Sequence, residues 1–367
     1  MRQMPGRLPL KASRYREGGS PHRYRRRACG LLFALLAVLL AACAAHSKSV
    51  ARFGIPDVVV HTSFSDEVGV ASWGIEKPDV TAMGIGFVQP EHRDIPPLER
   101  PQTEEIRVAN GEPFSSYLLL SSGQRTTLLV TALLDYKQVP FSLDGHEGLL
   151  HEITVEPGGD LELPMRLAVV KPGAHDLVVV AFKEPYDRPM DPGYRDRMFQ
   201  RLVGRRVVIV VGGVEEPIQT PAPDILGSPP PPEVTFGLRV AFATAPTGAE
   251  THPSKRFMAF GQGRCNETFP YQLWVSNYHG ETPVDYALVL FQDFHQVQLK
   301  GKDMVVVHLE AGHEVTIDDG LMLPAEPCIH ELQVVYVIDP YRSILRDEVT
   351  DPFVHGSNAV GIQVDCP

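Results

Sequence analysis

The sequence predicts an all-β protein made of two similar antiparallel β-sandwich modules. Residues 175–186 read His-Asp-Leu-Val-Val-Val-Ala-Phe-Lys-Glu-Pro-Tyr, and residues 330–341 read His-Glu-Leu-Gln-Val-Val-Tyr-Val-Ile-Asp-Pro-Tyr. Six of these twelve positions are identical. Both copies end in an acid-Pro-Tyr corner, where proline cannot donate to a sheet ladder. Residues 135–139 match 293–297, and 156–158 match 310–312, in the same order along the chain. Three landmarks in one order indicate a duplicated domain.

The first module, residues 55–214, contains many short segments rich in Val, Leu, Ile, Thr and aromatic residues. Turn sequences such as Asn110-Gly111 and Asp144-Gly145 separate them. Segments 178–180 and 207–211 do not alternate between apolar and polar residues, which is typical of strands buried on both faces. With no clear amphipathic helix, the pattern resembles an immunoglobulin-like outline. The expected strands are 58–60, 68–72, 106–108, 117–121, 127–134, 139–143, 151–156, 161–167, 177–182 and 207–211, with a loop at 89–102 and helical turns near 195–202.

The second module, residues 233–367, repeats this pattern after a proline-rich segment. Residues 215–232 include the run Pro229-Pro230-Pro231-Pro232, which favours an extended, semi-rigid spacer. An ordered loop packed between the modules is the alternative for the first half of this segment. The expected strands are 236–242, 256–260, 271–276, 285–291, 297–299, 305–309, 315–317, 332–338 and 360–364.

Charge is distributed unevenly along the chain. Residues 1–42 hold nine of the 34 Lys and Arg but one of the 45 Asp and Glu, so the remainder has 25 basic and 44 acidic residues and a net charge of −19. Nucleic acid and anionic lipid headgroups would repel such a body. We therefore expect no nucleic-acid partner.

The N-terminus has the layout of an export signal. Three arginines, 25–27, precede an apolar run, residues 30–42, which is shorter than the roughly 20 residues of a transmembrane helix. The run ends in Leu40-Ala41-Ala42-Cys43, which resembles the lipobox of bacterial lipoproteins. That resemblance implies cleavage of residues 1–42, lipidation of Cys43 and a short tether over residues 43–54. It also implies that the protein is anchored in a membrane of the cell envelope, on the exported side. The alternative is an ordinary secretory signal in which Cys43 is incidental.

The mature chain would retain three cysteines besides Cys43, and all three lie in the second module. An exported compartment permits disulfides. If strands 332–338 and 360–364 pair antiparallel, with Ile338 near Asn358, then Cys328 lies close to Cys366. We therefore expect a Cys328–Cys366 bridge, with Cys265–Cys328 as the alternative. A zinc site lacks the usual close cysteine pairs.

Several histidines are candidate catalytic or metal-binding residues. His175 and His330 are each followed by an acid, but adjacent residues of a strand point to opposite faces, so a structural role is favoured. The pairs His146/His151 and His308/His313 lie near predicted hairpins, where solvated histidines are more common than metal ligands. We therefore predict no metal, cofactor or catalytic residue.

The loops that follow the two Pro-Tyr corners are the best candidates for a binding surface. They mix aromatic residues with arginines, as interaction surfaces do. The alternative is that both loops fold back over the sheet edges. The candidate binding residues are Tyr186, Tyr194, Tyr341 and Arg342.

These patterns predict a non-catalytic, lipid-anchored envelope protein with tandem modules for binding or scaffolding, whose partner is an envelope protein or a glycan. The alternatives are a metal-dependent or carbohydrate-active envelope hydrolase, and an assembly chaperone that uses an exposed edge strand. Convergence of His146, His151 and the His175 region on one pocket with carboxylates would favour the hydrolase.

Overall fold

The computed structural model describes residues 55–72, 83–96, 99–168, 171–191, 201–213, 221–231, 240–246, 252–278, 280–341 and 353–366. In these residues the chain is built of β-strands, with two short 3-10 helices, η1 (Pro90–His92) and η4 (Pro253–Lys255). The predicted all-β class is therefore confirmed. No helix in the described part of the chain has the length and apolar character that crossing a bilayer requires.

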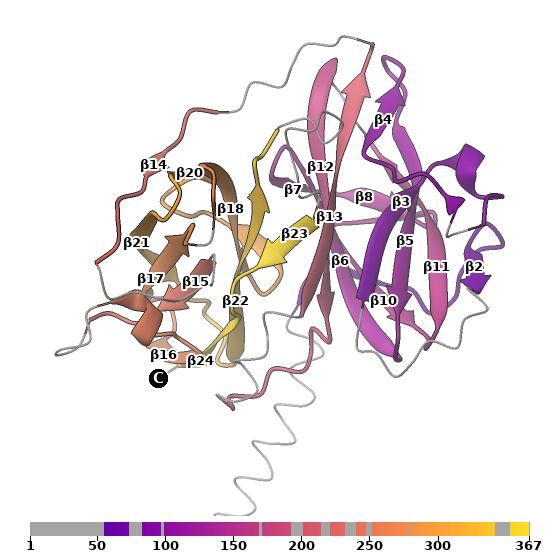
Figure 1. Cartoon of the computed structure of the whole chain (residues 1–367). Helices are drawn as coiled ribbons and strands as arrows, with labels where there is room; N and C mark the ends of the chain where they lie inside the picture. Colours follow the sequence, from indigo (N-terminus) through magenta and orange to yellow (C-terminus); the bar gives the residue numbers. More distant parts are fainter. Residues whose placement is uncertain are drawn as a thin grey trace, which may run out of the picture. The chain divides into compact units, whose positions relative to one another are not determined.

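The first module is a sandwich of two sheets (Figure 1). Its strands are β1 (Val58–Val60), β2 (Gly69–Ser72), β3 (Met83–Val88), β4 (Glu105–Val108), β5 (Phe114–Ser122), β6 (Thr126–Leu134), β7 (Lys137–Val139), β8 (Phe141–Leu143), β9 (His146–Gly148), β10 (Leu150–Val155), β11 (Gly159–Leu167), β12 (Gly173–Lys183) and β13 (Leu202–Val211). One sheet runs β1-β10-β6-β12-β13, and the other runs β3-β5-β11-β8-β9. Leucines 118 and 163 of the second sheet pack with Val179 and Ile209 of the first sheet in one core.

The second module repeats this plan. Its strands are β14 (Ile225–Leu226), β15 (Val240–Ala243), β16 (Phe260–Arg264), β17 (Thr268–Ser276), β18 (Val284–Gln292), β19 (His295–Val297), β20 (Val305–Leu309), β21 (Glu314–Met322), β22 (Ile329–Ile338), β23 (Phe353–Gly356) and β24 (Val360–Asp365). β12 lies between β6 and β13, and β22 lies between β18 and the pair β23 and β24. The two copies of the repeat therefore occupy the same sheet position, as predicted.

The hairpins confirm the repeat at the level of single residues. Asp135 and Tyr136 have φ values of 50° and 64°, and Asp293 and Phe294 have 48° and 67°. Both pairs form the two-residue turn of a tight hairpin, for which positive φ at both positions is the favoured geometry. Such matched backbone conformations show that the duplicated segments fold in the same way.

A third hydrophobic core lies between the two modules. In β12, Leu177 and Val179 belong to the core of the first module, whereas Val178 and Val180 pack with Val289 and other residues of the second module. This is why the valine-rich strands do not alternate: each of their faces is buried against a different partner. The other members of this core include Phe182, Phe291, Phe294, Val335 and Val337.

An approximate two-fold axis relates the modules where they meet. Gln138 N donates to Gln296 Oε1 at 2.6 Å, and Gln296 N donates to Gln138 Oε1 at 2.8 Å. β13 also pairs antiparallel with β23. A Cβ on Gly204 would lie 2.6 Å from Val354, and a Cβ on the equivalent Gly356 would lie 3.3 Å from Leu202. The same contacts thus occur twice, in reciprocal form.

Part of the proline-rich segment belongs to the second module. Ile225–Leu226, predicted as spacer, forms β14 and pairs parallel with β20, as β1 pairs parallel with β10. The fully antiparallel pairing predicted for the sandwiches is also incomplete, because β4 with β13 and β16 with β24 are parallel. These short parallel strands lie at sheet edges.

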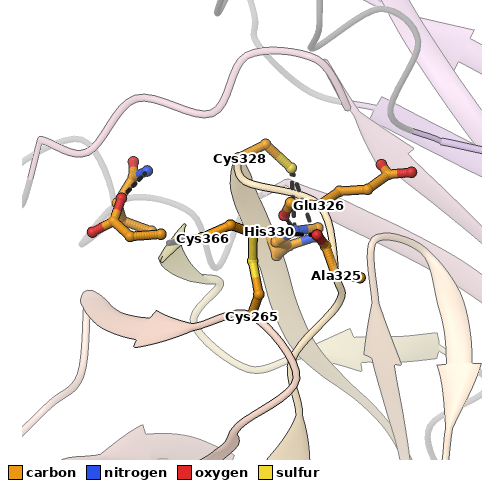
Figure 2. The surroundings of a disulfide bond; sticks show 8 residues. Cys265, Ala325, Glu326, Cys328, His330 and Cys366 are labelled. Atoms are coloured by element: carbon orange, nitrogen blue, oxygen red, sulfur yellow. Dashed lines mark hydrogen bonds between the residues drawn. A yellow bond between two sulfur atoms is a disulfide. The ribbon is translucent and has the colours of Figure 1, made fainter.

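The disulfide joins Cys265 to Cys366, with a Cα–Cα distance of 5.2 Å (Figure 2). Both predicted pairings are therefore wrong. β22 and β24 do pair antiparallel, but Leu332 lies opposite Val360, and β23 occupies the place beside the end of β22. This shifts the register by four residues. Cys366 follows Asp365, which pairs with Arg264 of β16, so its neighbour is Cys265.

Candidate functional site

In the structure, two of the four predicted binding residues are partly covered by the core between the modules. Tyr186 and Tyr341 are partly buried and pack against the core between the modules. The hydroxyl of Tyr186 donates to Glu152, and the ring of Tyr341 lies 5.2 Å from that of Tyr136. The other two, Tyr194 and Arg342, lie outside the described residues, as does Cys43.

A buried charged cluster ties the two modules together. Asp176 and Arg206 are fully buried, and their closest charged atoms are 3.7 Å apart. Tyr136 Oη and Tyr341 N donate to Asp176 Oδ2 at 2.7 and 2.8 Å, and Arg206 Nη1 donates to the carbonyl oxygen of Asp339 at 2.7 Å. Burial raises the pKa of Asp176, and the guanidinium of Arg206 opposes this rise. Because each group is paired across the module boundary, the cluster is structural.

Both recurring histidines bind the aspartate of the neighbouring hairpin. His175 Nδ1 lies 2.7 Å from Asp135 Oδ2, and His330 Nδ1 lies 2.5 Å from Asp293 Oδ2. The hydrogen bond that His175 donates to the Asp135 carboxylate raises the pKa of this histidine. These partners are not the adjacent acids Asp176 and Glu331, which follow on the opposite strand face. The duplicated pair thus fixes a hairpin to a strand, which agrees with the structural role favoured from the sequence.

The second module adds a thiol to this pair. Cys328 is partly exposed, stays outside the disulfide, and has its Sγ 3.1 Å from His330 Nε2. Figure 2 shows this sulfur pointing toward the imidazole of His330 and apart from the Cys265–Cys366 bond. Although burial would lower it, hydrogen bonds with Asp293 and Cys328 raise the pKa of His330 to about 10.

Asp293 is held from a second side by the first module. Arg188 Nη1 lies 2.7 Å from Asp293 Oδ1. Burial would raise the pKa of Asp293, but the bonds with His330 and Arg188 lower it. The result is a row of thiol, imidazole and carboxylate, which is the general arrangement of an activated nucleophile. Cys-x-His was the visible sequence signal, but the hairpin aspartate was not recognised as its partner.

Three other histidines gather at the edge of the first module. His61 Nε2 donates to His151 Nδ1 at 3.0 Å, and His151 Nε2 donates to the carbonyl oxygen of Phe141 at 3.1 Å. The ring of His146 lies 5.3 Å from that of His61. Burial lowers the pKa of His151 to about 4, so this ring is neutral near pH 7. His146 and His151 are recognisable in the sequence as a closely spaced pair, whereas His61 lies 85 residues before His146 and joins them only in the fold.

The remaining histidine candidates stay apart. His308 Nδ1 bonds to Asp285 Oδ1 at 2.7 Å, and His175 binds Asp135 in another module. Within the ranges that the structure describes, no three His, Cys, Asp or Glu side chains are grouped to hold a metal ion.

A polar hollow of about 530 Å³ lies on the first module. The guanidinium of Arg93 stacks 4.0 Å above the ring of Tyr117, and its Nε donates to Glu162 at 3.2 Å. Arg100 Nη1 donates to the other oxygen of Glu162 at 2.6 Å. Two arginines thus fix a buried carboxylate, and one of them holds the tyrosine ring in place. Among the described residues, no histidine lines this hollow.

No protein-family model matches the chain, and no curated protein matches it. Among solved structures, it is similar to the fibronectin(III)-like modules of Clostridium thermocellum CbhA, with 11% identity, a TM-score of 0.18 and coverage of 77% of this chain and 95% of that one. Tandem titin immunoglobulin domains give 8% identity, a TM-score of 0.19 and coverage of 78% and 98%. Escherichia coli alpha-2-macroglobulin gives 10% identity, a TM-score of 0.23 and coverage of 78% and 17%. At TM-scores this low, the similarities carry no argument about function.

Proposed function

We propose that the chain is a non-catalytic, lipid-anchored protein of the cell envelope, and that its two sandwiches act together as one unit for binding or scaffolding. The hydrophobic core shared by the two modules is the observation that carries this proposal. A buried core and a continuous sheet hold one module against the other, which suits a spacer or platform of fixed geometry. The lipobox-like Leu40-Ala41-Ala42-Cys43 supplies the anchor.

The distribution of the histidines supports binding over hydrolysis. A metal-dependent hydrolase needs histidines and carboxylates around one open site. Here His151 forms a buried hydrogen bond with His61. His175 is bound to Asp135 at the other end of the same sheet. The polar hollow beside Tyr117 is the surface we assign to a ligand, because a fixed aromatic ring and arginine offer both stacking and hydrogen bonds to a glycan.

Membrane fractionation tests the anchor. The Cys43→Ala variant should move from the membrane to the soluble fraction, because the acyl chains can no longer be attached. Cys29→Ser, a change of the other leader cysteine, is the matched control and should leave the protein in the membrane. If Cys43→Ala stays in the membrane after a high-salt wash, the lipoprotein assignment is refuted.

Glycan binding is tested separately on envelope polysaccharide immobilised on beads. Retention should fall on Tyr117→Ala and remain on Arg166→Ala, a change of an exposed arginine of the same strand pair. Equal retention of both variants would remove the hollow as the ligand site and leave the anchor result untouched.

A further inference from the structure

The thiol of Cys328 lies against a histidine that is itself fixed by further contacts, which an unbridged cysteine does not require. It is the cysteine left outside the bridge among the described residues, and it remains partly exposed. Its Sγ lies 3.1 Å from His330 Nε2, and the opposite ring nitrogen lies 2.5 Å from Asp293. Arg188, reaching from the first module, holds the other oxygen of that aspartate. Side chains from three segments of the chain therefore determine where the sulfur meets the imidazole: Cys328 and His330 at the start of β22, Asp293 in the hairpin turn, and Arg188 after β12.

The repeat shows that the thiol is not needed for this local structure. The first module has the same His175–Asp135 bond, and His175 Nε2 lies 3.0 Å from the carbonyl oxygen of Lys171. His330 Nε2 makes the same contact with Glu326, at 3.1 Å. At the position that corresponds to Cys328, the first module has Gly173. The histidine–aspartate pair thus forms without sulfur, and the thiol is an addition in the second copy.

The hydrogen bonds of His330 decide which chemistry the thiol can perform. Nδ1 faces a carboxylate, and Nε2 faces both a carbonyl oxygen and the sulfur. A ring that donates from both nitrogens is protonated, in keeping with the raised pKa of His330. An imidazolium cannot accept the thiol proton, so His330 is not a general base. It instead places a positive charge beside the sulfur, and such surroundings favour reaction of a cysteine as the thiolate.

We propose that Cys328 is a thiol–disulfide exchange site, positioned by His330 and Asp293, that forms a mixed disulfide with a disulfide-bearing molecule. The Cys328 thiolate attacks one sulfur of the incoming disulfide. A bond forms between Cys328 Sγ and that sulfur, and the old sulfur–sulfur bond breaks. Its electron pair leaves on the second sulfur, which takes a proton from solvent. The number of disulfide bonds is unchanged, so the step needs no oxidant. This inference is independent of the lipid anchor and of the hollow beside Tyr117.

The test uses the full chain with Cys29→Ser and Cys43→Ala, and dithiobis(nitrobenzoate) as the disulfide probe. One equivalent of thionitrobenzoate should be released per chain. For an ordinary thiol with a pKa of about 8.5, the rate falls roughly 80-fold between pH 8 and pH 6 because the thiolate fraction falls. For Cys328 the fall should be less than tenfold. Free glutathione, measured alongside, gives the ordinary profile.

Two matched variants show whether the reactivity of Cys328 depends on His330 or only on the exposure of the thiol. His330→Gln should restore the steep, ordinary profile, whereas His175→Gln, the same change in the first module, should leave the shallow profile intact. Peptide mapping should find the probe on Cys328. A steep profile in the unmodified site overturns the proposal even if His330→Gln does not fold. So does a shallow profile that survives His330→Gln, or a probe attached to Cys265 or Cys366.

Discussion

The Cys265–Cys366 bridge should stabilise the whole folded unit, and Cys366→Ser measures by how much. The two cysteines are 101 residues apart in sequence, so the bridge closes the second module from β17 to β24 into one loop. In the chain-entropy model, closing a loop of about 100 residues stabilises a protein by about 4.7 kcal/mol. Typical domains have a free energy of unfolding of about 5–15 kcal/mol. Loss of the bridge should therefore remove a large share of the stability.

Urea unfolding of the exported full chain, followed by circular dichroism, gives the free energy of unfolding. Cys366→Ser should lower it by about 4–5 kcal/mol, and reductant should lower the parent protein to the same level without affecting the variant further. Cys328→Ser is the control, and should change it by less than about 1 kcal/mol because this thiol forms no bridge. The shared core predicts that the loss appears in one transition and not only in the second module.

Two results would refute this reasoning. Non-reducing peptide mapping that recovers Cys328–Cys366 or Cys265–Cys328 would show that the strands carrying these residues pair differently. If Cys366→Ser changes the free energy of unfolding by less than about 1 kcal/mol, then the loop is already restrained in the unfolded chain.

Three further predictions concern the contacts between modules and the buried histidines. Phe291→Ala should lower the free energy of unfolding by about 3–5 kcal/mol, because it empties part of the core between the modules; two separate transitions in the parent protein would contradict this. Gln138→Ala and Gln296→Ala should each lower the free energy of unfolding by about 0.5–1.5 kcal/mol, since each side-chain amide accepts a hydrogen bond from the other residue's backbone N–H; no loss in either variant would contradict the reciprocal contact. The pKa of His151 is lowered in the folded chain, so between pH 6.5 and 4 the unfolded chain binds more protons than the folded chain does. The free energy of unfolding should therefore decrease by up to about 3 kcal/mol as the pH falls through this range. The raised pKa of His330 acts in reverse, with stability lost from pH 6.5 toward 10. Urea titrations at several pH values should show His151→Gln flattening the acid limb alone; an unchanged acid limb would exclude His151 as its cause.

Local chemistry made much of the fold predictable. Residue types alone identify the duplicated valine-rich strands, the acid-Pro-Tyr corners and the hairpin segments. In the structure, the two copies occupy equivalent positions. The lack of alternation in 178–180 indicated burial on both faces. It could not show that the second face is covered by the other module, because that contact joins residues more than 100 positions apart.

Two of the missed strands, β14 and β16, lack the usual signals of a strand. β16 reads Phe-Gly-Gln-Gly-Arg and β14 lies beside a proline run, so both resemble loops. Each forms because a neighbouring strand offers an open edge. Missing β16 hid the partner of Cys366, and missing β23 shifted the expected register of β24. The thiol site was missed for a similar reason, since Asp293 reaches His330 only when hairpin and strand pair.

The reciprocal contacts of Gln138 with Gln296 have the form of an isologous dimer interface, in which the same patch of each partner meets itself. Here the two partners are joined in one chain. A dimer of free modules would dissociate on dilution, but a linked pair holds its second half at a high effective concentration. The chain therefore behaves as a covalently fused dimer: its self-complementary patch is occupied at any expression level, and its duplicated faces elsewhere are free to diverge, as Gly173 and Cys328 have.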